Sequence, residues 1–297
     1  MRGIKKKDLS SKDFSISPEK KSEIIEVAYI PEHIISLMQA ISGGEPGIID
    51  DFLFFVKDNW IMFIGYPLSG HFQKPKQITE NTEVLIDIYD PEYIWVIAHE
   101  IPSELKKKAV EFQKDYYYTL LVEDFRPNRR LLREVEKASE SLKIRKERVF
   151  SSKHSALRDE FIRTKTLHPM VISLYNSMED YFRGSETAIL LSAATKEDEI
   201  TAFYCLDCGA HNFLAYITGC HSKTHYVPHA SDLLFVEMVG LARQMGKTEI
   251  NLGLGVTDGL RRFKEKWGGR PTIPYEFIEW RREPDIKKSL KALQSIL

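Results

Sequence analysis

The chain has 297 residues, 43% of them hydrophobic and 29% charged, and its 42 basic and 43 acidic side chains give a formal charge of -1. No apolar run approaches the roughly 18 residues of a membrane-spanning helix, so we expect no integral membrane segment. The balanced charge argues against nucleic-acid binding over the whole surface, and since domains usually hold about 100 to 200 residues, the length predicts two units.

The N-terminal segment, residues 1–22, is predicted to be a flexible tail. It starts with basic residues but lacks the apolar stretch that a signal peptide needs, so we expect a cytoplasmic protein. The three cysteines are few and odd in number. This suits free thiols in a reducing compartment better than a set of disulfides.

Residues 23–126 indicate a first α/β unit. The segment 31–42 has apolar residues at helical spacing and ends at the breaker sequence GGEPG. Residues 51–68 form two strand-like runs around KDN, which is typical of a tight antiparallel hairpin. Further strands are predicted over 83–90, 92–100 and 115–123, with a helix over 103–113.

Residues 127–297 indicate a second unit, which begins with a connecting helix over 128–143. One or two helices follow, interrupted near Pro169, and then a second hairpin that turns at KEDE. The remaining elements are a strand over 213–220, a helix over 231–246, a strand over 248–253, a basic helix and a last strand over 275–280. Helix and hairpin therefore occur twice in the same order.

The order of elements over residues 155–280 resembles the GNAT (GCN5-related N-acetyltransferase) fold. The sequence HASDLLFVEMVGLARQMGKTEINLG, followed by GLRRFKEKWGG, is similar to the Fem-type aminoacyltransferases and to the C-terminal domains of phosphatidylglycerol lysyltransferases, both of them tandem GNAT proteins. The likeness lies mostly in Gly259, Leu260, Phe263, Lys264, Trp267 and Gly268. It implies an α/β (α+β) fold of two tandem GNAT-like units, each a mixed, mostly antiparallel sheet flanked by helices, with the N-terminal unit as a divergent copy.

The same resemblance implies an acyl- or aminoacyltransferase with a small-molecule or peptide amine as acceptor. The donor would be an acyl-CoA, such as acetyl-CoA, or a charged tRNA. Acetyl-CoA-using members have a glycine-rich pyrophosphate loop where this chain has SKTHYVPHAS, and a tyrosine acid where it has Phe263. These departures favour an aminoacyl-tRNA donor. They leave open a non-catalytic GNAT-fold protein that binds a ligand or partner, and the oligomeric state is open between a monomer and a homodimer.

Acyl transfer to an amine needs positioned groups that stabilise the oxyanion. In the superfamily the fourth and fifth strands splay, so the amides after Tyr216 are expected to meet the acyl group. A helix starting near Asp258 would put Lys264 at the mouth of that cleft, as a cation for the oxyanion or a donor phosphate.

The alternative for the basic helix is a solvated face opposite an apolar face of Leu260, Phe263 and Trp267. On that reading Lys264 has no more function than its neighbour Lys266. The sequence alone leaves both interpretations open.

Two further kinds of group complete the predicted site. His229 and Glu237 are candidates for the base that deprotonates the acceptor ammonium. The helix beginning near Ser231, capped by Ser231 and Asp232, can bind phosphate through its free amides. The candidates for donor binding are Tyr216, Ile217, Thr218, Tyr226, Ser231, Asp232, Asn251 and Phe263.

A metal site is not expected. His221, His225 and His229 are spaced by four, but Pro228 breaks the helix that would stack them. Cys205 and Cys208 fall in a predicted strand, where residues three apart point to opposite faces.

Overall fold

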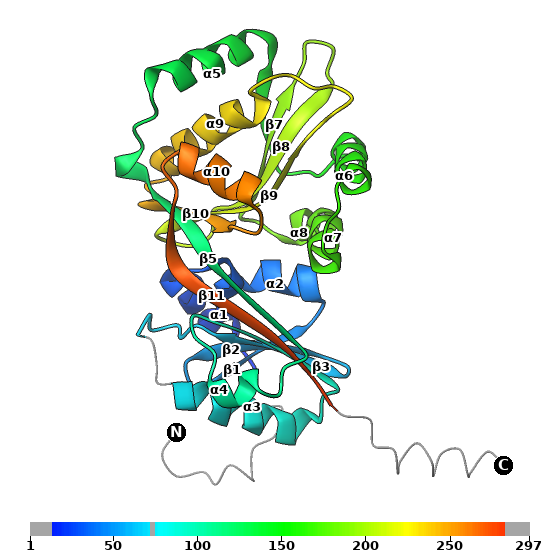
Figure 1. Cartoon of the computed structure of the whole chain (residues 1–297), viewed down its shortest axis with the longest axis vertical. Helices are drawn as coiled ribbons and strands as arrows, with labels where there is room; N and C mark the ends of the chain where they lie inside the picture. Colours follow the sequence, from blue (N-terminus) through cyan, green and yellow to red (C-terminus); the bar gives the residue numbers. More distant parts are fainter. Residues whose placement is uncertain (1–13, 72–74, 283–297) are drawn as a thin grey trace, which may run out of the picture.

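The computed structural model describes residues 14–71 and 75–282, and one order of elements occurs twice along the chain (Figure 1). The first half contains α1 (Pro18–Val27), the short 3-10 helix η3 (Pro31–His33), α2 (Ile35–Ser42), β1 (Glu45–Ile49), β2 (Phe52–Lys57), β3 (Trp60–Gly65), α3 (Pro75–Tyr89), β4 (Tyr93–Ala98), α4 (Ser103–Lys106) and β5 (Glu111–Leu121). The second half contains η4 (Val122–Asp124), α5 (Arg129–Ser141), β6 (Lys143–Glu147), α6 (Ser152–Thr164), α7 (Pro169–Asn176), α8 (Met178–Gly184), β7 (Ala188–Ala194), β8 (Ile200–Asp207), β9 (Phe213–His221), α9 (Ala230–Gln244), β10 (Glu249–Leu254), α10 (Asp258–Lys266) and β11 (Arg270–Arg281).

The strands form a single mixed sheet in the order β1-β2-β3-β4-β11-β5-β10-β9-β8-β7-β6. The pairs β3–β4 and β9–β10 are parallel, and the other neighbouring pairs are antiparallel. The two halves exchange their last strands, because β11 pairs with β4 while β5 pairs with β10. Figure 1 shows β5 and β11 as long strands that run from one half into the other. The predicted mixed, mostly antiparallel architecture is confirmed, with both units joined in one sheet.

Helices cover both faces of each half (Figure 1). In the second half, α5 and α9 bury Val135 and Met238 on one face, whereas α6 and α8 bury Leu157 and Tyr181 on the other. In the first half, α3 covers one face, and α1 and α2 cover the opposite one. Because side chains alternate along each strand, every strand contributes residues to two separate cores, one on each face of the sheet.

Tight turns explain why the predicted hairpins form. Asp58, in the KDN turn between β2 and β3, has a φ of 48°, and Asp198, in the KEDE turn between β7 and β8, has a φ of 72°. Aspartate tolerates this left-handed region better than most residues with a side chain. Gly246 ends the segment of α9 with a φ of 69°, as expected for the stop of that helix.

Several predicted elements differ from the observed ones. The prediction of a strand over 83–90 was wrong, because this segment, although rich in β-branched residues, is the second half of α3. The buried Ile78 and Leu85 lie on one face of that helix. The helix over 103–113 is limited to α4, and Glu111 already belongs to β5. The short strands β1 and β6 were not predicted. Of the predicted tail, residues 1–13 lie outside the described residues, and residues 18–22 belong to α1.

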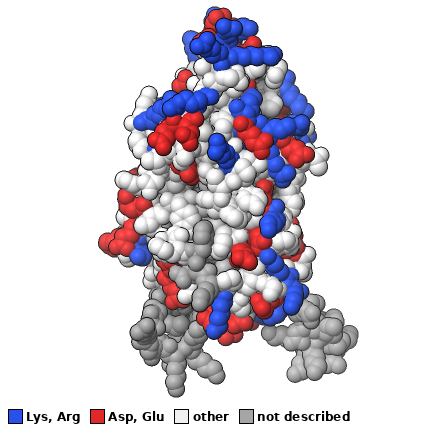
Figure 2. All heavy atoms as spheres, turned by 60° about the vertical axis from the view of Figure 1, so that its left-hand side comes forward, with Lys and Arg blue, Asp and Glu red and all other residues white. Residues whose placement is uncertain are grey.

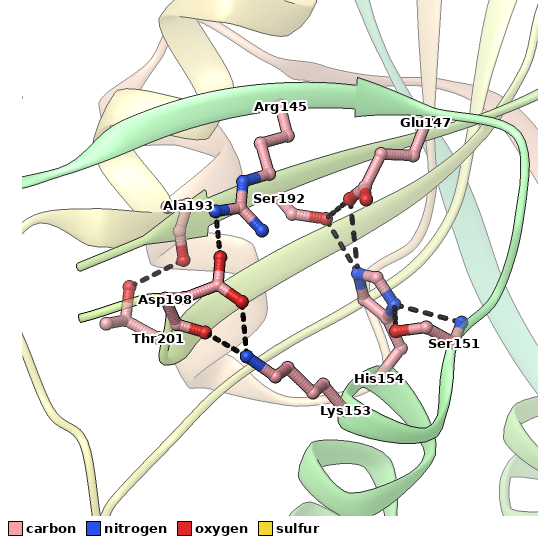
Figure 3. Close-up of polar contacts among 9 residues, drawn as sticks. All are labelled: Arg145, Glu147, Ser151, Lys153, His154, Ser192, Ala193, Asp198 and Thr201. Carbon is pink, nitrogen blue, oxygen red and sulfur yellow. Dashed lines mark hydrogen bonds and ion pairs between the residues drawn. The ribbon is translucent and has the colours of Figure 1, made fainter. Parts of the chain in front are cut away.

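A polar network fixes α6 to the outer edge of the sheet (Figure 3). The His154 ring accepts from the Ser151 amide at 3.1 Å through Nδ1, and its Nε2 lies 2.8 Å from Ser192 Oγ. Ser192 in turn donates to Glu147 at 2.9 Å. His154 is 1% exposed and burial lowers its pKa to about 4, so it is neutral at pH 7 and serves as a link between β6, β7 and α6.

Charges of both signs are spread over the surface. Figure 2 shows Lys and Arg gathered at the top of the molecule, where Figure 1 places α5, and mixed with Asp and Glu elsewhere on this face. Among residues 14–71 and 75–282, no helix is long and apolar enough to cross a membrane.

Candidate active site at the gap between β9 and β10

The parallel strands β9 and β10 pair over only three residues. Their ladder runs from Phe213 and Glu249 to Ala215 and Asn251, and ends there. Beyond this point β9 continues along β8 as far as His221, while β10 continues along β5 to Leu254. The two strands thus diverge as the resemblance implied, and the edge of β9 after Tyr216 faces a gap in the sheet.

A bulge in β10 shapes the gap. Asn251 is opposite Thr119 of β5, but Leu254 is opposite Tyr117, so the register shifts between them. Gly253 lies in this bulge with a φ of +73°, a conformation that favours glycine. A Cβ added at Gly253 would lie 3.6 Å from the Tyr216 carbonyl oxygen and 3.9 Å from Lys264 Nζ. A methyl group at this position would therefore fill the space between the backbone of β10 and both groups at ordinary contact distance.

Asn251 holds the bulge and leaves one donor unused. Its Oδ1 accepts from the Gly253 amide at 2.9 Å, whereas its Nδ2 is buried without a hydrogen-bond partner among the residues that the structure describes. Ile250 and Leu252 belong to the core under α9, so Asn251 between them points to the opposite face of the sheet. Its Nδ2 is a free hydrogen-bond donor beside the gap.

Lys264 is buried at the gap. It is 4% exposed, its Nζ donates to the Leu254 carbonyl at 2.5 Å, and the Tyr118 ring lies 5.6 Å from the nitrogen. The predicted apolar face of α10 was wrong in part, because Leu260 is 40% exposed and Lys264 takes the inner position. The expectation that Lys264 lies exposed at the mouth of the cleft was therefore wrong as well.

Burial changes the acidity of Lys264. Desolvation lowers the pKa of its ammonium to about 7, and Asp115 opposes this shift in part. Near neutral pH the side chain is thus divided between a cation and a free amine. It can supply a positive charge or exchange a proton at this position.

Asp232 organises the start of α9 in a way that the sequence did not suggest. The residue before the helix is His229, with a φ of 63° and no side-chain cap, so the predicted capping by Ser231 and Asp232 was wrong. Asp232 instead accepts from Lys266 at 2.5 Å, from the Trp267 indole at 3.0 Å and from His229. Lys266 is therefore part of an ion pair that ties α10 to α9, although its side chain is 38% exposed.

The other proposed residues divide between the gap and its surroundings. Tyr216 packs against Tyr204 with ring centroids 4.8 Å apart, and Ile217 and Thr218 follow it on the free edge of β9. Phe263 packs against Phe235 under α9. Three residues lie outside this group. His229 is bonded to Asp232 and lies near Glu134. Glu237 is on the exposed side of α9, and Tyr226 is 60% exposed beside His221.

The loop from Ser222 to His229 is anchored by a residue that sequence reasoning missed. Glu160 of α6 accepts from the Lys223 amide at 2.6 Å, the Thr224 amide at 3.0 Å and the Ser222 hydroxyl at 2.9 Å. Desolvation is the largest single effect on the Glu160 carboxyl and raises its pKa, but these hydrogen bonds together outweigh it and hold the pKa below its usual value. A carboxylate of the protein thus takes up amides that could otherwise bind a phosphate. No local sequence signal links Glu160 to a loop 62 residues later.

Metal ligands are not assembled in the part of the chain that the structure describes: no group of three or more His, Cys, Asp or Glu side chains is arranged to hold an ion. Cys205, Cys208 and Cys220 are free and buried. Cys205 lies in the core under α6 and α8, and Cys208 lies in the core under α9, so the two point to opposite faces as predicted.

Comparison with known proteins identifies the fold. The sequence matches no family profile and no curated protein. Solved structures match over nearly the whole chain: L-PGS from Bacillus licheniformis (17% identity, 93% of this chain and 96% of that one, TM-score 0.57), FemX (10%, 93% and 98%, 0.57) and a GCN5-related N-acetyltransferase from Kribbella flavida (11%, 90% and 98%, 0.55). A tandem GNAT protein from the clavulanic acid biosynthesis pathway matches as well (9%, 79% and 79%, 0.52). These likenesses show that the chain has a tandem GNAT fold.

Proposed function

We propose that this protein transfers an acyl or aminoacyl group to an amine at the gap between β9 and β10. The observation that carries the proposal is Lys264, which is 4% exposed at the place where the two strands separate. Burying an amine costs folding free energy, and this one is bonded to a carbonyl oxygen and not to a carboxylate. A buried ionisable group with a shifted pKa that is not needed for an ion pair is typical of a functional site.

The proposed reaction is an acyl substitution. The acceptor nitrogen attacks the donor carbonyl carbon, a C–N bond forms, and the C–O bond of an ester or the C–S bond of a thioester breaks. The proton lost by the nitrogen ends on the leaving oxygen or sulfur. Lys264 stabilises the oxyanion as a cation and, with a pKa of about 7, can pass a proton to the leaving group. Asn251 Nδ2 supplies a second hydrogen-bond donor from the other face.

The loop geometry favours an aminoacyl-tRNA ester over acyl-CoA as the donor. Coenzyme A binding in a GNAT fold needs free amides for a diphosphate, and here the amides of Lys223 and Thr224 are bonded to Glu160. Asp232 adds a second carboxylate in the first turn of α9, where a phosphate would be repelled. His229 and Glu237 remain proposals for the base. His229 is bonded to Asp232, so a role in positioning the start of α9 fits it better than a role as the base.

Transfer assays with a mixture of aminoacylated tRNAs, acetyl-CoA and longer acyl-CoAs, each with a panel of primary amines, test the proposal. We expect mass spectrometry to detect an amide product with charged tRNA, and to detect none with Lys264→Met. Absence of product with every donor would reject the proposal. If a donor then still raised the unfolding free energy, by about 2.7 kcal/mol at a hundredfold excess over Kd, the protein would be the non-catalytic alternative.

A further inference from the structure

A second ionisable group with a buried charged end has no part in the proposed reaction. Glu32, in η3, has its Oε2 buried, and no lysine or arginine among the described residues forms an ion pair with it. Burial raises the pKa of its carboxyl, and the nearby Tyr117 hydroxyl opposes this rise in part. A carboxyl in such a place costs folding free energy, and an apolar residue would fill the same core position without that cost.

Three tyrosines lie close enough to the Glu32 carboxyl to be affected by its charge. Tyr66, Tyr117 and Tyr275 are 0%, 2% and 7% exposed, and the nearby negative charge of Glu32 helps burial to raise the pKa of each phenol. Their rings meet edge to face, with centroids 6.1 Å apart for Tyr66 and Tyr117 and 5.5 Å for Tyr117 and Tyr275. The Tyr66 hydroxyl donates to the Pro274 carbonyl at 2.6 Å, which fixes that ring. Aromatic rings around one carboxylate are the composition of an ammonium site.

The cluster is joined to the gap through β5 and β10. Leu254 is the cross-strand partner of Tyr117, its side chain packs against the core that contains the tyrosines, and its carbonyl accepts from Lys264. The next residue of β5, Tyr118, points the other way and lies under Lys264 Nζ. Glu32 and Lys264 therefore lie on opposite faces of the same short piece of sheet, where β9 has already left β10.

We propose that Glu32, with Tyr66, Tyr117 and Tyr275, forms a binding site for a primary ammonium group of a substrate. The proposal rests on the proposed function, because an aminoacyl donor and an amine acceptor of that reaction both carry such a group. One source is the α-ammonium of an aminoacyl donor, and the other is an amine of the acceptor. An ammonium held on the face of Glu32 would keep its molecule at the gap, with the reacting carbonyl of a donor, or the attacking nitrogen of an acceptor, turned toward Lys264 on the opposite face.

Calorimetric titration of the full chain with alaninamide and with butylamine tests the site. Alaninamide carries the α-ammonium of an aminoacyl ester, and butylamine represents an acceptor amine. Their neutral controls are N-acetylalaninamide and butyramide. We expect at least one cation to bind about tenfold or more tighter than its neutral control, as for a charge-assisted hydrogen bond. Preference for alaninamide alone assigns the donor, and binding of butylamine assigns the acceptor.

Variants decide whether Glu32 is responsible. Glu32→Gln keeps the shape and removes the charge, so the preference for the cation should vanish. Glu26→Gln, at an exposed position of α1, makes the same charge change and should leave it intact. Tyr275→Leu should weaken cation binding by about three- to thirtyfold, since it removes one ring. Equal binding of charged and neutral probes, no binding of either cation, or an unchanged preference in Glu32→Gln would overturn the site. If the wild-type chain bound an ammonium probe in this way but gave no product in the transfer assays, the proposed function alone would be rejected.

Discussion

The two parallel strand pairs of the sheet differ in length: one is continuous, and the other separates after a short ladder. In the first half, β3 and β4 pair without interruption over six residues each, from Trp60 and Tyr93 to Gly65 and Ala98. In the second half, β9 and β10 pair over three and then separate. Gly65 makes the closed pair tight, because a Cβ there would lie 2.8 Å from the Ala98 Cβ. Two halves with one order of elements thus differ at their parallel pairs, and among the described residues only the second half separates its parallel strands.

The lysines after each pair show the same difference. Lys106 in α4 follows β4 as Lys264 in α10 follows β10. Lys106 forms a 2.7 Å ion pair with the buried Glu276 carboxylate, so its charge supports the fold. Lys264 is bonded to a backbone carbonyl beside the gap. The contacts of Lys106 are those of a residue that stabilises the structure, whereas we propose that Lys264 serves the reaction at a cost in stability.

Replacing these lysines by methionine gives the largest expected effect. Lys264→Met should lower transfer by about 10- to 1000-fold, the range for loss of one oxyanion contact. Its unfolding free energy should stay the same or rise by about 1 to 3 kcal/mol, because a desolvated ammonium is removed. Lys106→Met should leave transfer unchanged and lower the unfolding free energy by about 1 to 3 kcal/mol, since Glu276 loses its nearer partner.

The pH dependence adds a signature to the same experiment. The folded pKa of Lys264, about 7, lies below that of the unfolded chain, so the unfolded state binds more protons between about pH 7 and 10. The unfolding free energy should therefore contain a contribution that rises with pH over this window and is missing in Lys264→Met. Urea unfolding at pH 7 and 9 measures it. A strong loss of stability in Lys264→Met would mean that Lys264 is structural, like Lys106.

Filling the gap gives the next largest effect. Gly253→Ala places a methyl group between the Tyr216 carbonyl and Lys264, and should lower transfer by about 10- to 100-fold by excluding the acyl group. Gly246→Ala is the matched control, with a φ of +69° and open space around its Cβ. Both changes should cost about 1 kcal/mol of stability from the left-handed backbone. Equal transfer rates in the two variants would place the reaction away from Gly253.

Local sequence patterns predicted the elements of the second half well, and long-range contacts explain what they missed. The basic helix and the strand before it were predicted, and the resemblance put Lys264 near the diverging strands. Its burial was not foreseen, because helical periodicity groups Leu260 with Phe263 and Trp267, whereas tertiary packing turns Lys264 inward. The exchange of β5 and β11 likewise depends on pairing between distant segments, on which periodicity carries no information.

A pair of buried histidines allows the two halves to be compared in stability. His33 in the first half and His154 in the second are both buried, and desolvation lowers the pKa of each to about 4. Since the unfolded chain takes up protons from about pH 6.5 downward and the folded chain does not, each histidine should lower the unfolding free energy by about 2 kcal/mol between pH 7 and pH 5.

Urea unfolding at pH 7 and pH 5 checks this, with His33→Gln and His154→Gln as the variants. Each variant should show a smaller fall in unfolding free energy between pH 7 and pH 5 than the wild-type protein, even if the substitution also lowers the stability at pH 7. Because one sheet runs through both halves, we expect a single unfolding transition in which both shares are additive. Two separate transitions, each sensitive to one histidine, would show that the halves unfold independently in spite of the exchanged strands.

The smallest expected effect concerns the loop that separates this chain from acetyl-CoA-using GNAT folds. Wild-type protein should show no binding of coenzyme A at micromolar concentrations, because the Lys223 and Thr224 amides are held by Glu160. Glu160→Gln replaces the carboxylate by a neutral group that holds the amides less strongly, and should allow weak, millimolar binding of coenzyme A while changing transfer from charged tRNA little. Asp159→Asn, at the exposed neighbouring position, makes the same charge change without touching the loop. If wild-type protein bound coenzyme A tightly, the carboxylate of Glu160 would not be the barrier, and the preference for an aminoacyl ester over a thioester donor would lose its structural basis.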